Sequence, residues 1–184
     1  MIGVLPKSLE VGGKYYKINS DFRVVLNLFE LFNNSELNNL EKAYICVNTL
    51  FVDEIPDELF EEAVKKAFWF CDGGDMPKSE PAKVKMLDWE HDESIIFPAV
   101  NKAAGCEVRA IPYMHWWTFL GYFGEIGEGL FSTVMNIRHK RADGKKLDKW
   151  EREFLRKHKD LVILYTDEER QAIDETEEFL KTIT

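Results

Sequence analysis

The densest group of side chains that could carry chemistry is residues 88–93, which read DWEHDE. On a helix, Asp88, His91 and Asp92 would share one face, because residues three and four positions apart are neighbours there. Two carboxylates and an imidazole so arranged could ligate a divalent metal or pair an acid with a base. The alternative without a chemical role is an acidic first turn of a helix that faces solvent and interacts with the helix dipole. We favour the solvent-facing turn because the sequence contains no second ligand pair at matching spacing, so a metal-dependent enzyme is a distant alternative.

Other signs of catalysis are weak. His115 could complete such a site, but beside Trp116 and Trp117 it is more typical of a core histidine bonded to the backbone. The sequence contains no GxSxG motif, P-loop or GxGxxG motif, and no CxxC pair. We therefore predict a protein that is not an enzyme, with no catalytic residues, metal site or cofactor. The three cysteines are interpreted as small buried apolar residues in a reducing cytoplasm; they are Cys46, Cys71 and Cys106.

The charge of the 184-residue chain is unevenly distributed around its net value of -9. Residues 138–159 contain ten Lys or Arg and four Asp or Glu, a net charge of +6, which leaves -15 for the remainder. The basic stretch could neutralise phosphates, but the acidic remainder would repel them and no recognition-helix pattern is present. We therefore predict no nucleic-acid partner. An acidic protein, or the chain's own acidic C-terminal helix, is the expected partner of this stretch.

A membrane partner is also not expected. The longest uncharged apolar run, about residues 111–124, contains Pro112 and His115 and is too short to span a bilayer. The N-terminus has no basic-plus-apolar leader, so we expect the protein to stay in the compartment where it is made. Five Trp and thirteen Phe residues require a core or an interface to cover them.

The elements that must position these residues are mostly helical. Residues 8–18 alternate around Gly12-Gly13, which predicts a short β-hairpin lying on helices. Helical spacing predicts three consecutive helices, the second capped by Ser35 and the third ended by Gly73-Gly74. The expected ranges are about residues 22–32, 35–51 and 56–71.

The second half of the chain continues the helical pattern. A helix is predicted over residues 87–104, either kinked or divided at Pro98 and ended by Gly105. The following apolar stretch, residues 113–123, predicts a helix buried on most sides at the centre of the core. A helix of about residues 130–139, a charged helix from residue 147, and a last helix with a Thr166–Glu169 capping box complete the chain.

The expected fold class is therefore mainly α. It comprises a helical bundle of about six to eight helices, a small N-terminal β-hairpin and a charged C-terminal helical hairpin. Two units are expected: residues 1–140 as hairpin plus helical core, and residues 141–184 as a C-terminal helical extension packed on the core or swapped with it.

Several segments together resemble the bacteriophage gene-product-fifteen family, over about residues 5–159. They are Asp21-Phe22-Arg23 after the hairpin, Asp88-Trp89-x-x-Asp92, Asn101-Lys-x-Ala-Gly105-x-Glu107-x-Arg109, His115-Trp116-Trp117-x-Phe119, and Ile137-Arg138 before Gly144-Lys-Lys-Leu147. The order of the Asp-Trp-x-x-Asp and His-Trp-Trp-x-Phe elements is the most specific part of this resemblance.

The resemblance implies a protein of long-tailed phages or prophages, from the gene region that encodes tail assembly chaperones. Such chaperones coat the long helical tape measure protein in the host bacterial cytoplasm and help recruit tail tube subunits. The expected function is that of a non-enzymatic tail assembly chaperone. The expected partner is the tape measure protein, with the tail tube protein and further copies of this chain as possible partners. The alternative is a structural tail component retained in the virion.

Two aromatic surfaces are the candidate partner-binding sites. One is the edge of the aromatic helix, with Tyr113 and Trp117. The other is the amphipathic C-terminal pair of helices, with Trp150, Phe154, Phe179 and Leu180. The competing interpretation of the His-Trp-Trp-x-Phe segment is core packing alone. Because successive helical residues point about 100° apart, at least one of the two tryptophans can reach the rim of the core.

Overall fold

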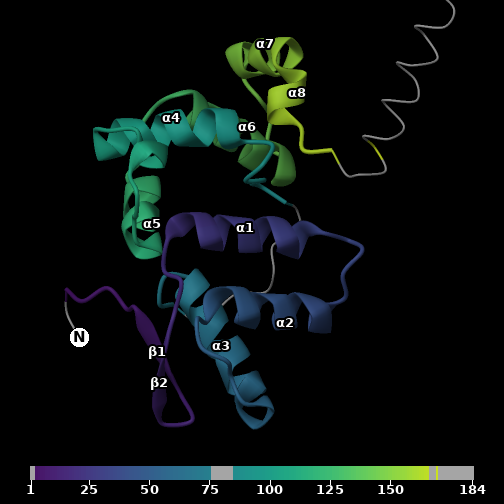
Figure 1. The fold of residues 1–184 in the computed structure, drawn as a ribbon. Helices are drawn as coiled ribbons and strands as arrows, with labels where there is room; N and C mark the ends of the chain where they lie inside the picture. The colour runs from purple at the N-terminus through teal and green to yellow at the C-terminus, as the bar shows by residue number, and fades with distance from the viewer. Residues whose placement is uncertain (1–2, 76–84, 166–168, 170–184) are drawn as a thin grey trace, which may run out of the picture.

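The computed structural model describes residues 3–75, residues 85–165 and residue 169. Over these residues the chain is mainly helical and carries one two-stranded antiparallel hairpin, as predicted (Figure 1). The α-helices are α1 (Phe22–Asn33), α2 (Asn39–Leu50), α3 (Phe60–Cys71), α4 (Glu93–Ala104), α5 (Trp116–Gly124), α6 (Leu130–Ala142), α7 (Lys149–Lys157) and α8 (Lys159–Val162), with short 3-10 turns η1 (Asp57–Leu59) and η2 (Val108–Ala110).

The hairpin forms where the glycine pair predicts it. Strands β1 (Ser8–Val11) and β2 (Lys14–Lys17) pair in antiparallel register around Gly12 and Gly13, whose φ angles are 57° and 75°. Positive φ at both turn residues is the requirement of a tight hairpin turn, which glycine meets without strain. One face of the hairpin is buried, and β1 packs against α3.

The helices form two packed groups joined by α5. In the first group α1 packs on α2 and α2 packs on α3, while in the second α4 packs on α6 and α6 on α8. Helix α5 contacts both α1 and α4 (Figure 1). Trp116 at its start is fully buried, and Phe119 stacks on Phe22 with ring centroids 4.6 Å apart. The prediction that this segment is the centre of the core is confirmed.

Several predicted helix starts are wrong. Helix α3 begins at Phe60, after the 3-10 turn η1, rather than at Pro56, and α5 begins at Trp116 rather than at residue 113. Helix α2 begins at Asn39 rather than near Ser35, because Asn38 and Glu41 form a reciprocal capping box. Helix α4 begins at Glu93 rather than at residue 87, and residues 89–92 form a turn. Pro98 lies inside α4, which is a single helix ended by Gly105.

The C-terminal part of the chain is only partly described. Asp148 caps α7 through a capping box with Glu151, and α8 follows directly and packs on α6. The predicted last helix, including its Thr166–Glu169 capping box, falls almost entirely outside the described residues. Within residues 3–75 and 85–165, no helix has the length and apolar character needed to cross a membrane.

The cysteines divide between core and surface. Cys46 and Cys71 are buried, as predicted, and they lie beside each other, but Cys106 is exposed, so its predicted burial is wrong. Cys106 directly follows the Gly105 that ends α4, and the chain there turns along the surface.

Candidate binding groove and charged cluster

A buried ion pair joins the start of α4 to α6. The guanidinium of Arg138 donates to both carboxylate oxygens of Asp92, over 2.6 and 2.8 Å. Asp92 is 0% exposed and Arg138 is 6% exposed. The same guanidinium also donates to three backbone carbonyls, those of Met86, Leu161 and Val162. Arg138 therefore binds together three segments that are far apart in sequence.

His91 extends this charged cluster, which we define as His91, Asp92 and Arg138. Its Nδ1 lies 2.9 Å from Asp92 Oδ1, and its Nε2 lies 2.8 Å from the backbone oxygen of Asp160. Burial of the Asp92 carboxyl acts to raise its pKa, but hydrogen bonds from Arg138, His91 and the Asp88 N–H outweigh it and lower the pKa below the usual value. Asp92 is therefore held as a carboxylate.

The predicted helical face of Asp88, His91 and Asp92 does not exist. Asp88 directly precedes the turn of residues 89–92, which contains His91 and Asp92, and Asp92 points into the protein toward Arg138 rather than toward solvent. Both the metal-binding face and the solvent-facing first turn are thus wrong, because a guanidinium from a distant helix completes the cluster. No group of three or more His, Cys, Asp or Glu side chains in the described parts of the chain is arranged to hold a metal ion.

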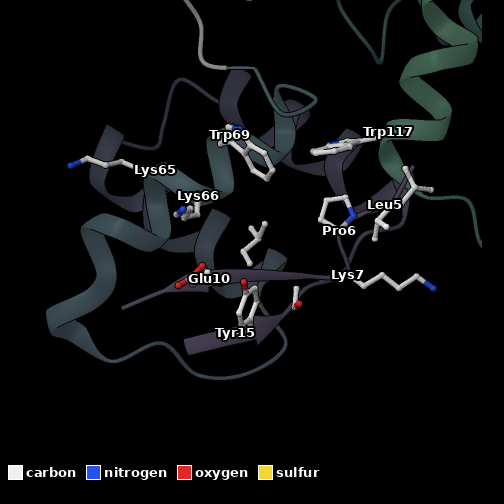
Figure 2. Close-up of a pocket in the computed structure, with 12 residues that line it drawn as sticks. Leu5, Pro6, Lys7, Glu10, Tyr15, Lys65, Lys66, Trp69 and Trp117 are labelled. Carbon is white, nitrogen blue, oxygen red and sulfur yellow. The ribbon is translucent and has the colours of Figure 1, made fainter. Parts of the chain in front are cut away.

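A groove of about 820 Å³ lies between the N-terminal segment, β1, α3 and the start of α5 (Figure 2). Apolar side chains line it, including Leu5 and Pro6 from the N-terminal segment and Tyr15 from the hairpin. Trp69 of α3 and Trp117 of α5 lie side by side at one end, with their rings T-shaped and 5.3 Å apart between centroids. We call this the tryptophan groove.

Three contacts hold Trp117 at the groove. Its indole N–H donates to the Phe70 carbonyl over 2.9 Å, and its backbone N–H donates to Nδ1 of His115, the N-cap of α5. Gly74, with a φ of 94°, passes so close that a Cβ there would lie 2.9 Å from Trp117 Cη2. Trp117 remains half-buried, with its free side on the groove, whereas Trp116 is fully buried.

His115 is a buried histidine bonded to the backbone, as predicted. Because Nδ1 accepts from the Trp117 N–H, Nε2 carries the proton and donates to the Pro6 carbonyl over 2.9 Å. Burial lowers the pKa of His115, and nearby Lys7 lowers it further, against the opposing effect of the Pro6 hydrogen bond. The neutral imidazole thus ties the N-terminal segment, one wall of the groove, to α5.

Charged side chains stand at the edge of the tryptophan groove. Lys7, Lys65 and Lys66 flank it, with Glu10 as the acidic member (Figure 2). Lys65 also pairs with Glu61 on the exposed side of α3, over 2.6 Å. The groove thus has an apolar floor and a mainly basic rim.

Tyr113 lies next to the groove but does not line it. The residue is 45% exposed, its hydroxyl is 2.8 Å from the Ser20 hydroxyl, and the Lys7 ammonium lies over its ring. The structure therefore brings Trp117 to the groove, with Tyr113 beside it. Sequence reasoning missed Leu5, Tyr15 and Trp69, although the outward position of Tyr15 in the alternating hairpin was a usable signal.

The second predicted surface lies at the other end of the molecule. Trp150 on α7 is 59% exposed and packs on the half-buried Phe154 with ring centroids 5.4 Å apart. Helix α7 and the hairpin lie at opposite ends of Figure 1, so this surface and the tryptophan groove are separate. Phe179 and Leu180 lie outside the described residues.

A family model matches most of the chain. No curated protein and no solved structure matches the chain. A family model described as Bacteriophage Gp15 protein matches residues 1–164, a range that includes the charged cluster, the tryptophan groove and α7. The resemblance based on the Asp-Trp-x-x-Asp and His-Trp-Trp-x-Phe elements is therefore confirmed. The chain is a phage protein and belongs to the Bacteriophage Gp15 protein family.

Proposed function

We propose that this protein is a non-enzymatic tail assembly chaperone that binds the phage tape measure protein in the host bacterial cytoplasm. The observation that carries the proposal is the tryptophan groove, an open apolar surface on a protein of a phage family. A groove of this size and character is typical of a site that receives one face of an amphipathic helix.

The apolar lining and the charged rim of the groove indicate which kind of helix it would bind. Trp69, Trp117 and Leu5 offer apolar contacts, and two tryptophans at one end are typical anchors of a protein interface. Lys7 and Lys66 at the rim favour a helix whose polar edge carries Asp or Glu. A tape measure protein is a long helical chain with exposed apolar stripes, so segments with acidic edges are its expected binding sites.

The non-enzymatic part of the proposal rests on how the polar side chains are used. In the densest polar group, Asp92 is neutralised by Arg138 and both nitrogens of His91 are engaged by protein oxygens. Trp116 and His115 likewise bond to backbone carbonyls. These side chains support the fold and the groove walls, which agrees with a protein that works by binding.

The test is co-expression with the long helical product of the tape measure gene. The wild-type chain should raise the soluble fraction of that product at least several-fold, and Trp117→Ala should lose most of this effect. Phe68→Ala is the control, because Phe68 is a partly exposed aromatic residue of α3 that does not line the groove. Circular dichroism of each variant establishes that it is folded.

Two results would contradict the proposal. If the tape measure protein is no more soluble with the wild-type chain than without it, the chaperone function is wrong. If Trp117→Ala unfolds the protein but the folded fraction still binds, Trp117 is a core residue only. Composition of purified virions decides the alternative, since a chaperone is absent from them and a structural tail component is present.

A further inference from the structure

We propose that copies of this protein assemble head to tail, with the α2 face of one copy against the α7 face of the next. The α2 face is the exposed apolar surface formed by Leu37, Leu40, Tyr44, Ile45 and Phe60. The α7 face is the surface formed by Trp150 and Phe154. Both faces are separate from the tryptophan groove, so this assembly does not depend on the proposed function.

The α2 face is an apolar surface without a cover in the described chain. Leu40 is 71% exposed and Tyr44 is 60% exposed, while the Tyr44 ring packs on that of Phe60 with centroids 5.9 Å apart. A hollow of about 620 Å³ lies between these side chains. Large apolar side chains gathered around a hollow mark a protein interaction site rather than ordinary surface.

Two acidic residues, Glu41 and Asp57, line the hollow of the α2 face, and the sequence around it is acidic. Residues 36–62 contain eight Asp or Glu and one Lys, a net charge of -7. That lysine, Lys42, donates to the Phe32 carbonyl. Glu54, Asp57 and Glu58 form no ion pair with other side chains of the described residues. The face therefore presents an apolar centre and a negative rim that includes Asp57, unpaired among the described residues.

The α7 face has the opposite charge. Residues 140–159 contain nine Lys or Arg and four Asp or Glu, a net charge of +5. Three of those carboxylates are neutralised by lysines of the same stretch: Asp143 by Lys145, Glu151 by Lys140, and Glu153 by Lys157. Within the described residues, Lys146, Lys149 and Arg156 near Trp150 have no carboxylate partner. An exposed aromatic pair thus lies within a positive rim.

The two faces cannot meet within one molecule. In Figure 1, α1 and α6 lie between α2 and α7. An apolar centre with a negative rim on one side and an apolar centre with a positive rim on the other are complementary only between copies. Such a heterologous contact leaves one free face of each kind at the ends, so it continues into open chains or closes into rings.

The chain's own C-terminal residues are the competing cover for the α7 face. Residues 166–184 contain seven Asp or Glu against two Lys or Arg, so they also suit a basic surface. Being acidic, however, they would be repelled by the α2 face and would leave it uncovered. A single contact between copies covers both faces, which is why we commit to a second copy as the occupant.

The test uses the purified full-length chain alone, by sedimentation velocity over a range of protein concentrations. Wild type should form species larger than dimers that grow with concentration. Tyr44→Lys and Trp150→Glu should each weaken association at least 10-fold, because each places a repelling charge at the centre of one face. Leu130→Glu is the matched control at an exposed apolar position outside both faces and should assemble like wild type.

A mixture of the two variants gives the sharpest result. Tyr44→Lys keeps an intact α7 face and Trp150→Glu keeps an intact α2 face, so the mixture should associate at protein concentrations at which each variant alone stays monomeric. Wild type that stays monomeric, or that stops at a symmetric dimer, overturns the proposal. So does a mixture that stays monomeric. So does an increase in assembly when Glu175→Lys and Glu178→Lys are introduced into the otherwise wild-type chain, since the C-terminal residues are then the cover of the α7 face.

Discussion

The charged cluster and the tryptophan groove both connect segments that are distant in sequence, but the cluster is buried whereas the groove is open to solvent. Each joins segments distant in sequence through side chains that donate to backbone carbonyls: Arg138 in the cluster, and His115 and Trp117 at the groove. The cluster is sealed, since its carboxylate and guanidinium are nearly inaccessible to solvent. The groove keeps its apolar side chains open to solvent.

The difference indicates that one set of residues stabilises the fold and another set is available to bind a partner. A buried charge is tolerated only when its partner and hydrogen bonds are complete, as they are for Asp92. Apolar surface, in contrast, can stay exposed at a local cost that a partner later removes. Loss of a cluster residue should therefore act on stability, and loss of a groove residue should act on binding.

The largest expected effect is that of Arg138→Met. The substitution leaves the Asp92 carboxylate buried without a countercharge and leaves three backbone carbonyls without their donor. Removing one partner of a buried ion pair typically costs about 3–5 kcal/mol of the free energy of unfolding. Chemical denaturation followed by circular dichroism measures this loss.

Two further variants make the Arg138 experiment specific. Arg156→Met removes an exposed arginine of the same basic stretch and should change the stability by less than about 0.5 kcal/mol. The double variant Asp92→Leu with Arg138→Met should recover part of the loss, because apolar residues can replace a buried pair. If Arg138→Met and Arg156→Met lower the free energy of unfolding equally, the buried Arg138 contributes no more to stability than an exposed arginine, which would contradict the comparison.

The next prediction compares the loss of stability caused by alanine substitution of the two consecutive tryptophans. Trp116→Ala opens a cavity in the sealed core and should cost about 3–5 kcal/mol. Trp117→Ala removes a half-buried ring and one hydrogen bond to the Phe70 carbonyl, so its cost should be about 1–3 kcal/mol. Thermal or urea unfolding of the two variants gives the ratio. A larger cost for Trp117 than for Trp116 would make the groove a part of the core.

Much of the fold could be predicted because it is encoded locally. Gly12-Gly13 defines the hairpin turn, and apolar spacing located the helices to within a few residues in most cases. The exceptions depend on side chains that the periodicity does not reveal. Asn38 is a better-placed cap than Ser35, and Asp92 ends a turn because its partner is Arg138, 46 positions away.

The candidate site was only half predictable for the same reason. Helical geometry indicated that one of the two tryptophans reaches the rim, and Trp117 does. Nothing local indicated that Leu5 and Trp69 would join it, since these residues come from segments about 110 and 50 positions earlier. Which apolar surface is left open is decided by the packing of whole helices.

Acid should weaken the charged cluster only below the ordinary pKa of an Asp carboxyl group. The pKa of Asp92 is lowered in the folded protein, so its contribution is complete above the ordinary Asp pKa of 3.8 and is lost as the pH falls through the lowered value. Unfolding free energies of wild type and Arg138→Met, compared from pH 6 to pH 3, should converge toward low pH. Parallel curves would contradict a charged Asp92.

The smallest expected effect is a pH dependence of the groove wall at His115. Its pKa is lowered from 6.5 in the folded protein, so the unfolded chain takes up the proton first and stability falls as the pH drops from 6.5 toward the lowered value. Protonation of Nδ1 also removes the acceptor of the Trp117 N–H, and loss of a helix cap costs about 0.5–2 kcal/mol.

His115→Asn isolates this contribution from the other three histidines of the chain. Asparagine can still cap α5 but does not titrate, so the variant should lack the part of the decline between pH 7 and pH 5 that belongs to His115. Tryptophan fluorescence should report the same difference at Trp117, because the His115 bonds hold both that residue and the Pro6 wall. If wild type and His115→Asn decline equally over this range, the groove wall is not held by a neutral histidine.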